Sequence, residues 1–252
     1  MYKVNNLLSN LNIKIVKELG GIKVLEYQRD LSVTPSTAVD YYFSSKMNCH
    51  RRQVLIELNN DSYVLQAGAM QWTVGDVSMS SGIKSVGDFA KKAFVGKVTG
   101  ESAVKPEYKG NGLLMLEPTF KHIILEDVSK WKGMVIDDGM FLASESTVKH
   151  TITRRSNISS AIAGGEGIFN LCLEGNCIVA LESRVPESEL IEFVLQNDEV
   201  KIDGNMAVAW SKSLQFTVER TSKTLIGSAA SGEGLVNVYR GTGNILMAPV
   251  LR

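Results

Sequence analysis

The sequence lacks the features that would place it in several specialised classes of protein. No apolar run approaches the ~18 residues that a membrane-spanning helix requires. Its three cysteines are an odd number and do not indicate a disulfide framework. Basic and acidic residues both number 27, so the basic excess typical of a dedicated nucleic-acid-binding protein is missing. Charges interrupt the N-terminal segment and no secretory signal is apparent, so we expect a cytoplasmic protein.

What is present indicates a globular, strand-rich protein. Apolar residues make up 44% of the 252 residues and charged residues 21%, as in chains that bury a core. Short runs with period-two alternation dominate, and glycine, asparagine and aspartate stand between them. No linker rich in proline, glycine or serine divides the chain. We therefore expect one domain that covers residues 1–252.

One phrase occurs three times and predicts hairpins. Each copy opens with Gly-Glu and a small residue, and a second glycine follows nine or ten residues later, before a short apolar run. The leading glycines lie 65 and 67 residues apart. We interpret each copy as strand, tight turn and return strand, with glycine supplying positive φ. The leading glycines are Gly100, Gly165 and Gly232, and the second glycines are Gly110, Gly175 and Gly241.

A second phrase lies between these copies. The segment "MVIDDGMFLAS" matches "VKIDGNMAVAW", and "YVLQAGAMQWT" is a weaker third copy. Each is an apolar strand, a turn and another apolar strand, with the turns at Gly139, Gly204 and Gly68. Nearby, residues 55–62 resemble residues 193–200. The spacing of both phrases predicts a repeated structural unit.

The repeats lead to a specific all-β architecture. We predict three β-sandwich or double-stranded β-helix-like repeats related by a pseudo-threefold axis, with two short helical insertions. The C-terminal segment is too short for a whole unit, and residues 54–80 resemble its missing part. We therefore expect the C-terminal hairpin to dock there and close the three units, which would remove exposed strand edges. The expected parts are N-terminal strands plus a helix (1–53), a partial repeat plus a helical insertion (54–99), a repeat (100–164), a repeat (165–231) and the C-terminal hairpin (232–252).

Two segments break the strand pattern and predict helices. Residues 34–47 have Thr34 as an N-cap and Pro35 at the first helical position. Residues 82–96 place apolar side chains on one face and lysines elsewhere, which predicts a peripheral amphipathic helix. We favour packing of its apolar face on the β core. Weak, salt-sensitive contact with an anionic membrane surface is the alternative.

Together, "LQAGAMQWTVGDVSM", "GMFLAS", "GGEGIFN" and "SGEGLVNVYRGTGNILM" resemble the family of altered inheritance of mitochondria protein 24. The resemblance covers roughly residue 22 to the C-terminus. It implies a β-rich fold related to the trp RNA-binding attenuation protein, repeated three times. It implies no chemistry for bacterial members, and a link to inner-membrane organisation for the mitochondrial member.

The three glutamates Glu101, Glu166 and Glu233 are the most suggestive set of candidate residues. Near a threefold axis their carboxylates could hold Mg²⁺, Ca²⁺ or a basic partner. We favour the other interpretation, in which each glutamate accepts backbone N–H bonds within its own glycine turn.

The remaining reactive residues predict no catalytic or cofactor site. His50, His122 and His150 are not paired as a metal site requires. We expect His150 to be packed in the core and His122 to be solvated. Cys172 and Cys177 flank a turn that could bring them together as a redox pair, but we favour reduced thiols.

We therefore predict a non-enzymatic binding or scaffolding protein without a cofactor. Its partner would be an unknown protein or a second copy of the chain. The alternatives are a metal-dependent enzyme that uses Glu101, Glu166 and Glu233, or an RNA-binding module by analogy of fold. No Lys or Arg position recurs in all three copies, so the nucleic-acid signal is weak.

Overall fold

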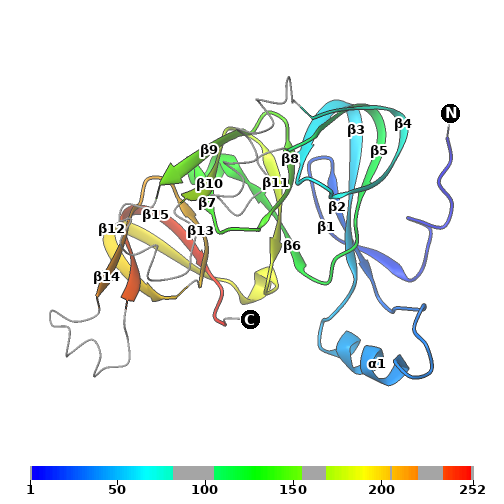
Figure 1. Ribbon diagram of the computed structural model, residues 1–252, viewed down its shortest axis with the longest axis horizontal. Coiled ribbons are helices and arrows are strands. Elements are labelled where there is room, and N and C mark those ends of the chain that lie inside the picture. Colours follow the sequence, from blue (N-terminus) through cyan, green and yellow to red (C-terminus); the bar gives the residue numbers. More distant parts are fainter. Residues whose placement is uncertain (1, 82–104, 155–168, 205, 221–234, 251–252) are drawn as a thin grey trace.

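Strands dominate the computed structural model, which describes residues 2–81, 105–154, 169–204, 206–220 and 235–250 (Figure 1). The β-rich fold expected from the sequence is confirmed. The described strands are β1 (Ile13–Leu19), β2 (Ile22–Tyr27), β3 (Arg52–Leu65), β4 (Met70–Ser80), β5 (Glu107–Leu116), β6 (His122–Asp127), β7 (Met134–Ile136), β8 (Phe141–Glu145), β9 (Lys149–Arg154), β10 (Phe169–Glu174), β11 (Ile178–Ser183), β12 (Ile191–Asp203), β13 (Ala207–Ser211), β14 (Gln215–Arg220) and β15 (Leu235–Met247). The described helices are α1 (Ala38–Lys46) and the 3-10 helices η1 (Val128–Trp131) and η2 (Glu187–Glu189).

These strands form two curled antiparallel sheets. The first, of eight strands, runs β1-β2-β3-β8-β11-β6, and β5 pairs with β3 while β4 pairs with β5. The second, of seven strands, runs β12-β15-β13-β7-β10-β9, and β14 also pairs with β15. Figure 1 shows β3, β4 and β5 at one end of the molecule, β12, β14 and β15 at the other, and β7 to β11 between them.

The largest core cluster joins the two sheets. It includes Leu181 on β11 of the first sheet and Leu173 on β10 of the second, both almost fully buried. A leucine buried in this way stabilises the fold by about 1.5–3 kcal/mol. Each sheet also has its own cluster, around Leu58 in the first and around Trp210 in the second.

Three of the predicted glycine turns lie between strands. Gly68 lies between β3 and β4, Gly139 between β7 and β8, and Gly204 between β12 and β13. Their φ angles are +80°, +73° and +53°, in the region where a side chain is unfavourable.

The predicted hairpins at Gly110 and Gly241 are wrong. Both glycines have positive φ, yet each lies inside a continuous strand, β5 or β15. The partner strand has a β-bulge at this point, which contains Asn60 in β3 or Asn197 in β12. Positive φ therefore bends the ladder here without reversing the chain. Gly175 does separate two strands, but these strands, β10 and β11, belong to different sheets. Gly100, Gly165 and Gly232 lie outside the described residues.

The C-terminal strand belongs to the second sheet. β15 pairs with β12, β13 and β14, whereas residues 54–80 lie in β3 and β4 of the first sheet. The expected docking of the C-terminal segment beside residues 54–80 is therefore not the pairing that the described strands make. The arrangement of the units around a pseudo-threefold axis stays a prediction.

The helix predicted at residues 34–47 is present but begins later. α1 starts at Ala38 with Thr37 at the N-cap position. The carbonyl of Thr34 accepts hydrogen bonds from the backbone N–H groups of Thr37 and Ala38, so Pro35 lies in a turn that precedes the helix. The helix predicted at residues 82–96 lies outside the described part of the chain.

Candidate functional site

The glutamate set cannot be placed among the described residues. Glu101, Glu166 and Glu233 all lie in segments that the structure does not describe, so their convergence stays a prediction. In the described ranges, no group of three or more His, Cys, Asp and Glu side chains could hold a metal ion. In the same ranges, no helix has the length and apolar character needed to cross a membrane.

Cys172 and Cys177 are buried free thiols in different parts of the core. Cys172 lies on β10 in the cluster of the second sheet, and Cys177 precedes β11 in the cluster that joins the sheets. The chain passes from one sheet to the other at Gly175, so the hairpin that would place the sulfurs opposite each other does not form. Burial raises the pKa of both thiols, that of Cys177 to about 11. Both groups are therefore protonated and weakly nucleophilic at neutral pH.

His150 is packed as expected, although it is only half-buried. Its ring lies edge-on to that of Phe141, with 5.0 Å between ring centroids. Burial, with a smaller effect of the Lys105 charge, lowers the pKa of His150 to about 4. Its Nε2 atom is buried and has no hydrogen-bond partner in the described structure. The histidine is therefore neutral at physiological pH. His122, expected to be solvated, is half-buried at the start of β6.

Two neighbouring hollows lie along the glycine turns. The larger, of about 380 Å³, lies between the Gly68 turn, residues 117–119 and β8. The smaller, of about 280 Å³, lies between the Gly139 turn, β13 and the residues that follow β15. Lys121, Gly139 and Glu182 line both hollows.

Two of the residues that line both hollows, Lys121 and Glu182, form an ion pair. The Lys121 ammonium donates a hydrogen bond to the Glu182 carboxylate, which comes from the end of β11. The Lys121 side chain is 53% exposed, so the pair contributes at most about 1 kcal/mol to stability. The two charges neutralise each other and supply no nucleophile, and the arrangement suits polar contacts better than catalysis.

The long strands β4 and β12 present free edges. Among the described strands, β4 pairs only with β5, and β12 pairs only with β15. Both strands are mostly exposed along their length. Unpaired backbone N–H and C=O groups along such edges can pair with another chain. The repeated phrases gave no sign of these edges, because closure of the three units on one another would have paired them.

A network of charges lies beside the β12 edge. Arg240 on β15 donates bidentate hydrogen bonds to Glu219 on β14, at 2.6 and 2.9 Å, and also pairs with Glu199 on β12. These bonds lower the pKa of Glu219 to about 2. Lys201 lies 3.2 Å from Glu199. The network links the three strands at this end of the second sheet.

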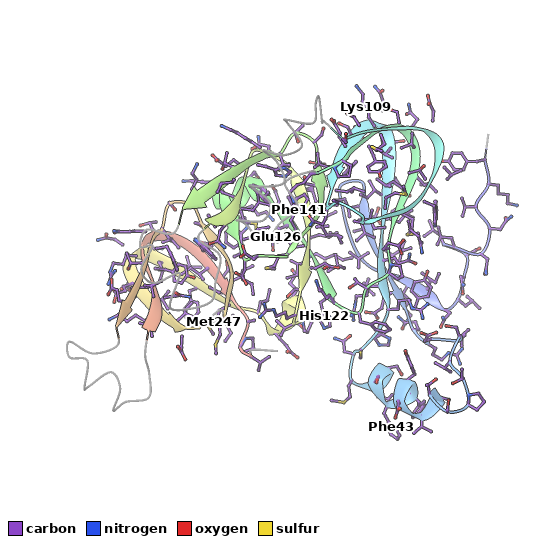
Figure 2. All side chains as sticks on the ribbon, in the orientation of Figure 1. Phe43, Lys109, His122, Glu126, Phe141 and Met247 are labelled. Carbon is purple, nitrogen blue, oxygen red and sulfur yellow. The ribbon has the colours of Figure 1, made fainter. Side chains whose placement is uncertain are left out.

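Helix α1 presents an exposed apolar surface. None of its residues is buried, and Val39, Tyr42 and Phe43 are 58–63% exposed at a spacing that places them on one face. Figure 2 labels Phe43 on the helix, below the sheets. Lys46 lies over the Tyr42 ring, 5.2 Å from its centroid.

Three comparisons with known proteins agree with one another. Residues 46–250 match the family model described as "Mitochondrial biogenesis AIM24". An uncharacterized protein of Streptococcus pyogenes serotype M6, M6_Spy0233, is 28% identical over 191 residues, which make up 73% of this chain and 75% of that protein. The crystal structure of protein SPYM3_0169 from Streptococcus pyogenes is similar with a TM-score of 0.58 and 26% identity, and the match covers 81% of this chain and 90% of that chain.

Proposed function

The chain belongs to the AIM24 family, and from this premise we propose that it is a non-enzymatic scaffolding protein that binds further copies of itself. The family match covers residues 46–250, which include both free strand edges. The relatives found are uncharacterised, so the function is argued from the site alone.

The observation that carries this proposal is that two long strands, β4 in the first sheet and β12 in the second, each have a single partner among the described strands. β4 has 11 residues and β12 has 13, about twice the ~5–6 residues of an average strand. The unpaired backbone groups along an edge of this length can pair with a strand of another chain. A long edge at each end of the molecule suits assembly by strand addition.

A second part of the proposal is that the chain consists of three related units. At each of three glycine turns, a residue just after the turn accepts the same backbone hydrogen bond, at 2.7–2.8 Å, from a residue at or just beyond the end of the neighbouring strand. This recurrence supports repeated units with repeated contact surfaces. The bonds run from the N–H groups of Glu117, Glu182 and Ala248 to the carbonyls of Ala69, Met140 and Met206.

Sedimentation velocity over a range of protein concentrations tests the scaffolding function. We expect the weight-average mass to rise with concentration above the 27.6 kDa of one chain. The proposal requires this rise in a purified preparation with its thiols reduced, so that a disulfide through the exposed Cys49 cannot account for it. A mass that stays at one chain at every concentration would contradict it.

A further inference from the structure

Two pairs of strands in this protein join by the same contact. β8 pairs with the end of β3 so that Ala143 lies opposite Leu65 and Ser144 opposite Val64. β13 pairs with β7 in the same way, with Ala209 opposite Ile136. In both pairs the first strand, β8 or β13, begins just after a glycine turn. The second strand, β3 or β7, ends just before another glycine turn. The chain therefore uses one edge-to-edge contact twice.

The first strand of each pair also has an equivalent partner strand on its other side and a bulge at the equivalent position. β8 pairs with β11 and has a bulge at Leu142, and β13 pairs with β15 and has a bulge at Val208. β4 pairs with β5 and has its bulge at Gln71, just after the Gly68 turn. On this basis Trp72 of β4 corresponds to Ala143 and to Ala209.

The second strand of each pair has a counterpart as well. β3, β7 and β12 each end just before a glycine turn, and their last apolar residues are Leu65, Ile136 and Ile202. Among the described strands, β3 and β7 have an outer neighbour at this point and β12 has none. β4 and β12 could thus form a third contact of the same kind, but they do not pair with each other within one chain.

We infer that the β4 edge of one copy pairs with the β12 edge of the next, antiparallel, with Trp72 opposite Ile202 and Val74 opposite Val200. This inference rests on the proposed scaffolding function and names its contact. Figure 1 places β4 and β12 at opposite ends of the molecule, so the contact joins chains head to tail. Such a contact builds a ring if the rotation closes and a filament if it does not.

The backbone supports this register. The N–H of Gln66 donates to the carbonyl of Leu142 at 2.8 Å, and the N–H of Asp137 donates to that of Val208 at 3.0 Å. The same bond in the new contact runs from Asp203 to the carbonyl of Gln71. The side chains are compatible too, because residues 70–74 carry no charge that would oppose Lys201 or Asp203.

Cysteine cross-linking tests the register. In a Cys49→Ser background, which removes the exposed thiol, Val74→Cys protein is mixed with Val200→Cys protein under mild oxidation. In the two contacts within the chain, the residues equivalent to Val74 and Val200 form a non-hydrogen-bonded pair. The Cα atoms of such a pair lie about 4.5 Å apart, close enough for a disulfide. We expect a disulfide-linked dimer in the mixture and little in either protein alone.

A matched control uses Val77→Cys in place of Val74→Cys. Val77 is half-buried on the same strand, but it lies about 10 Å further along. Equal cross-linking in the control, or none in the mixture, would overturn the register. A disulfide that forms only within one chain of the Val74→Cys, Val200→Cys double variant would show closure inside a chain and would also overturn the inference.

A second variant blocks the edge without disturbing the fold. Val64 and Val135 are the residues equivalent to Lys201, and their backbone groups face the neighbouring strand. Lys201→Pro therefore removes an outward N–H and leaves the ladder between β12 and β15 intact. We expect Lys201→Pro to reduce association at least tenfold and Lys201→Thr to retain it. If both variants associate like the wild type, the scaffolding function stands and this contact is wrong. If the wild type does not associate, both proposals fall.

Discussion

At the scale of single residues, the ion pair between buried Arg52 and partly buried Glu26 should contribute strongly to stability. The Arg52 side chain is 4% exposed, lies 2.8 Å from the Glu26 carboxylate and donates to the Asn48 side chain at 2.8 Å. Removing the arginine leaves a partly buried carboxylate without its cation. We expect Arg52→Ala to lower the free energy of unfolding by roughly 3–5 kcal/mol, measured by urea denaturation. A loss below about 1 kcal/mol, the range of exposed pairs, would contradict this assignment.

His150 makes stability depend on pH. Its pKa is about 4 in the folded protein and about 6.5 in the unfolded chain. The contribution of His150 to the free energy of unfolding is complete above pH 6.5. It is lost as the pH falls towards 4, because between these pH values only the unfolded chain binds the proton. The slope is at most about 1.4 kcal/mol per pH unit. We expect His150→Phe to remove this part of the acid sensitivity in denaturation measured from pH 7 to 4. Parallel curves for the variant and the wild type would show that His150 does not titrate in this way.

At the scale of elements, two glycines with similar backbone angles should respond differently to alanine. A Cβ atom at Gly110 would lie 1.9 Å from the carbonyl oxygen of Asp76 on β4, whereas at Gly241 the nearest atom is 3.7 Å away. Gly241→Ala should cost only the strain of positive φ, about 1–3 kcal/mol. Gly110→Ala should cost more in thermal or urea unfolding, because it also pushes β4 from β5. Equal losses would mean that the backbone of β4 yields freely.

Helix α1 should contribute little to folding stability through its apolar face. Phe43 is 62% exposed and no residue of the helix is buried. We expect Phe43→Ser to change the free energy of unfolding by no more than about 0.5 kcal/mol, as for other exposed positions. A loss of several kcal/mol in urea denaturation would show that the helix packs on the sheets in solution.

At the scale of the whole molecule, association of folded chains should stabilise the fold. Because the unfolded chain has no paired edges, assembly shifts the equilibrium towards the folded state by mass action. We expect the Tm to rise with protein concentration for the wild type and for Lys201→Thr. For Lys201→Pro the Tm should rise less over the same range of concentration. A Tm that rises equally with concentration in all three proteins would place the association at another surface.

Several features followed from the sequence alone. Period-two alternation predicted a β-rich fold, and the turns at Gly68, Gly139 and Gly204 lie where the repeated phrase placed them. The helix at residues 34–47 and the family were also predicted. These features depend on local patterns, that is, on the residues that need positive φ and on the faces that strands bury.

Other features were decided by tertiary structure. Positive φ serves a tight turn and a strand facing a bulge equally well, so the sequence could not show that Gly110 and Gly241 lie inside strands. Lys121 and Glu182 lie 61 residues apart in the sequence and meet only because β6 pairs with β11. The free edges of β4 and β12 follow from which strands share a sheet. Strand pairing between distant segments depends on how the whole chain packs, and no local pattern encodes it.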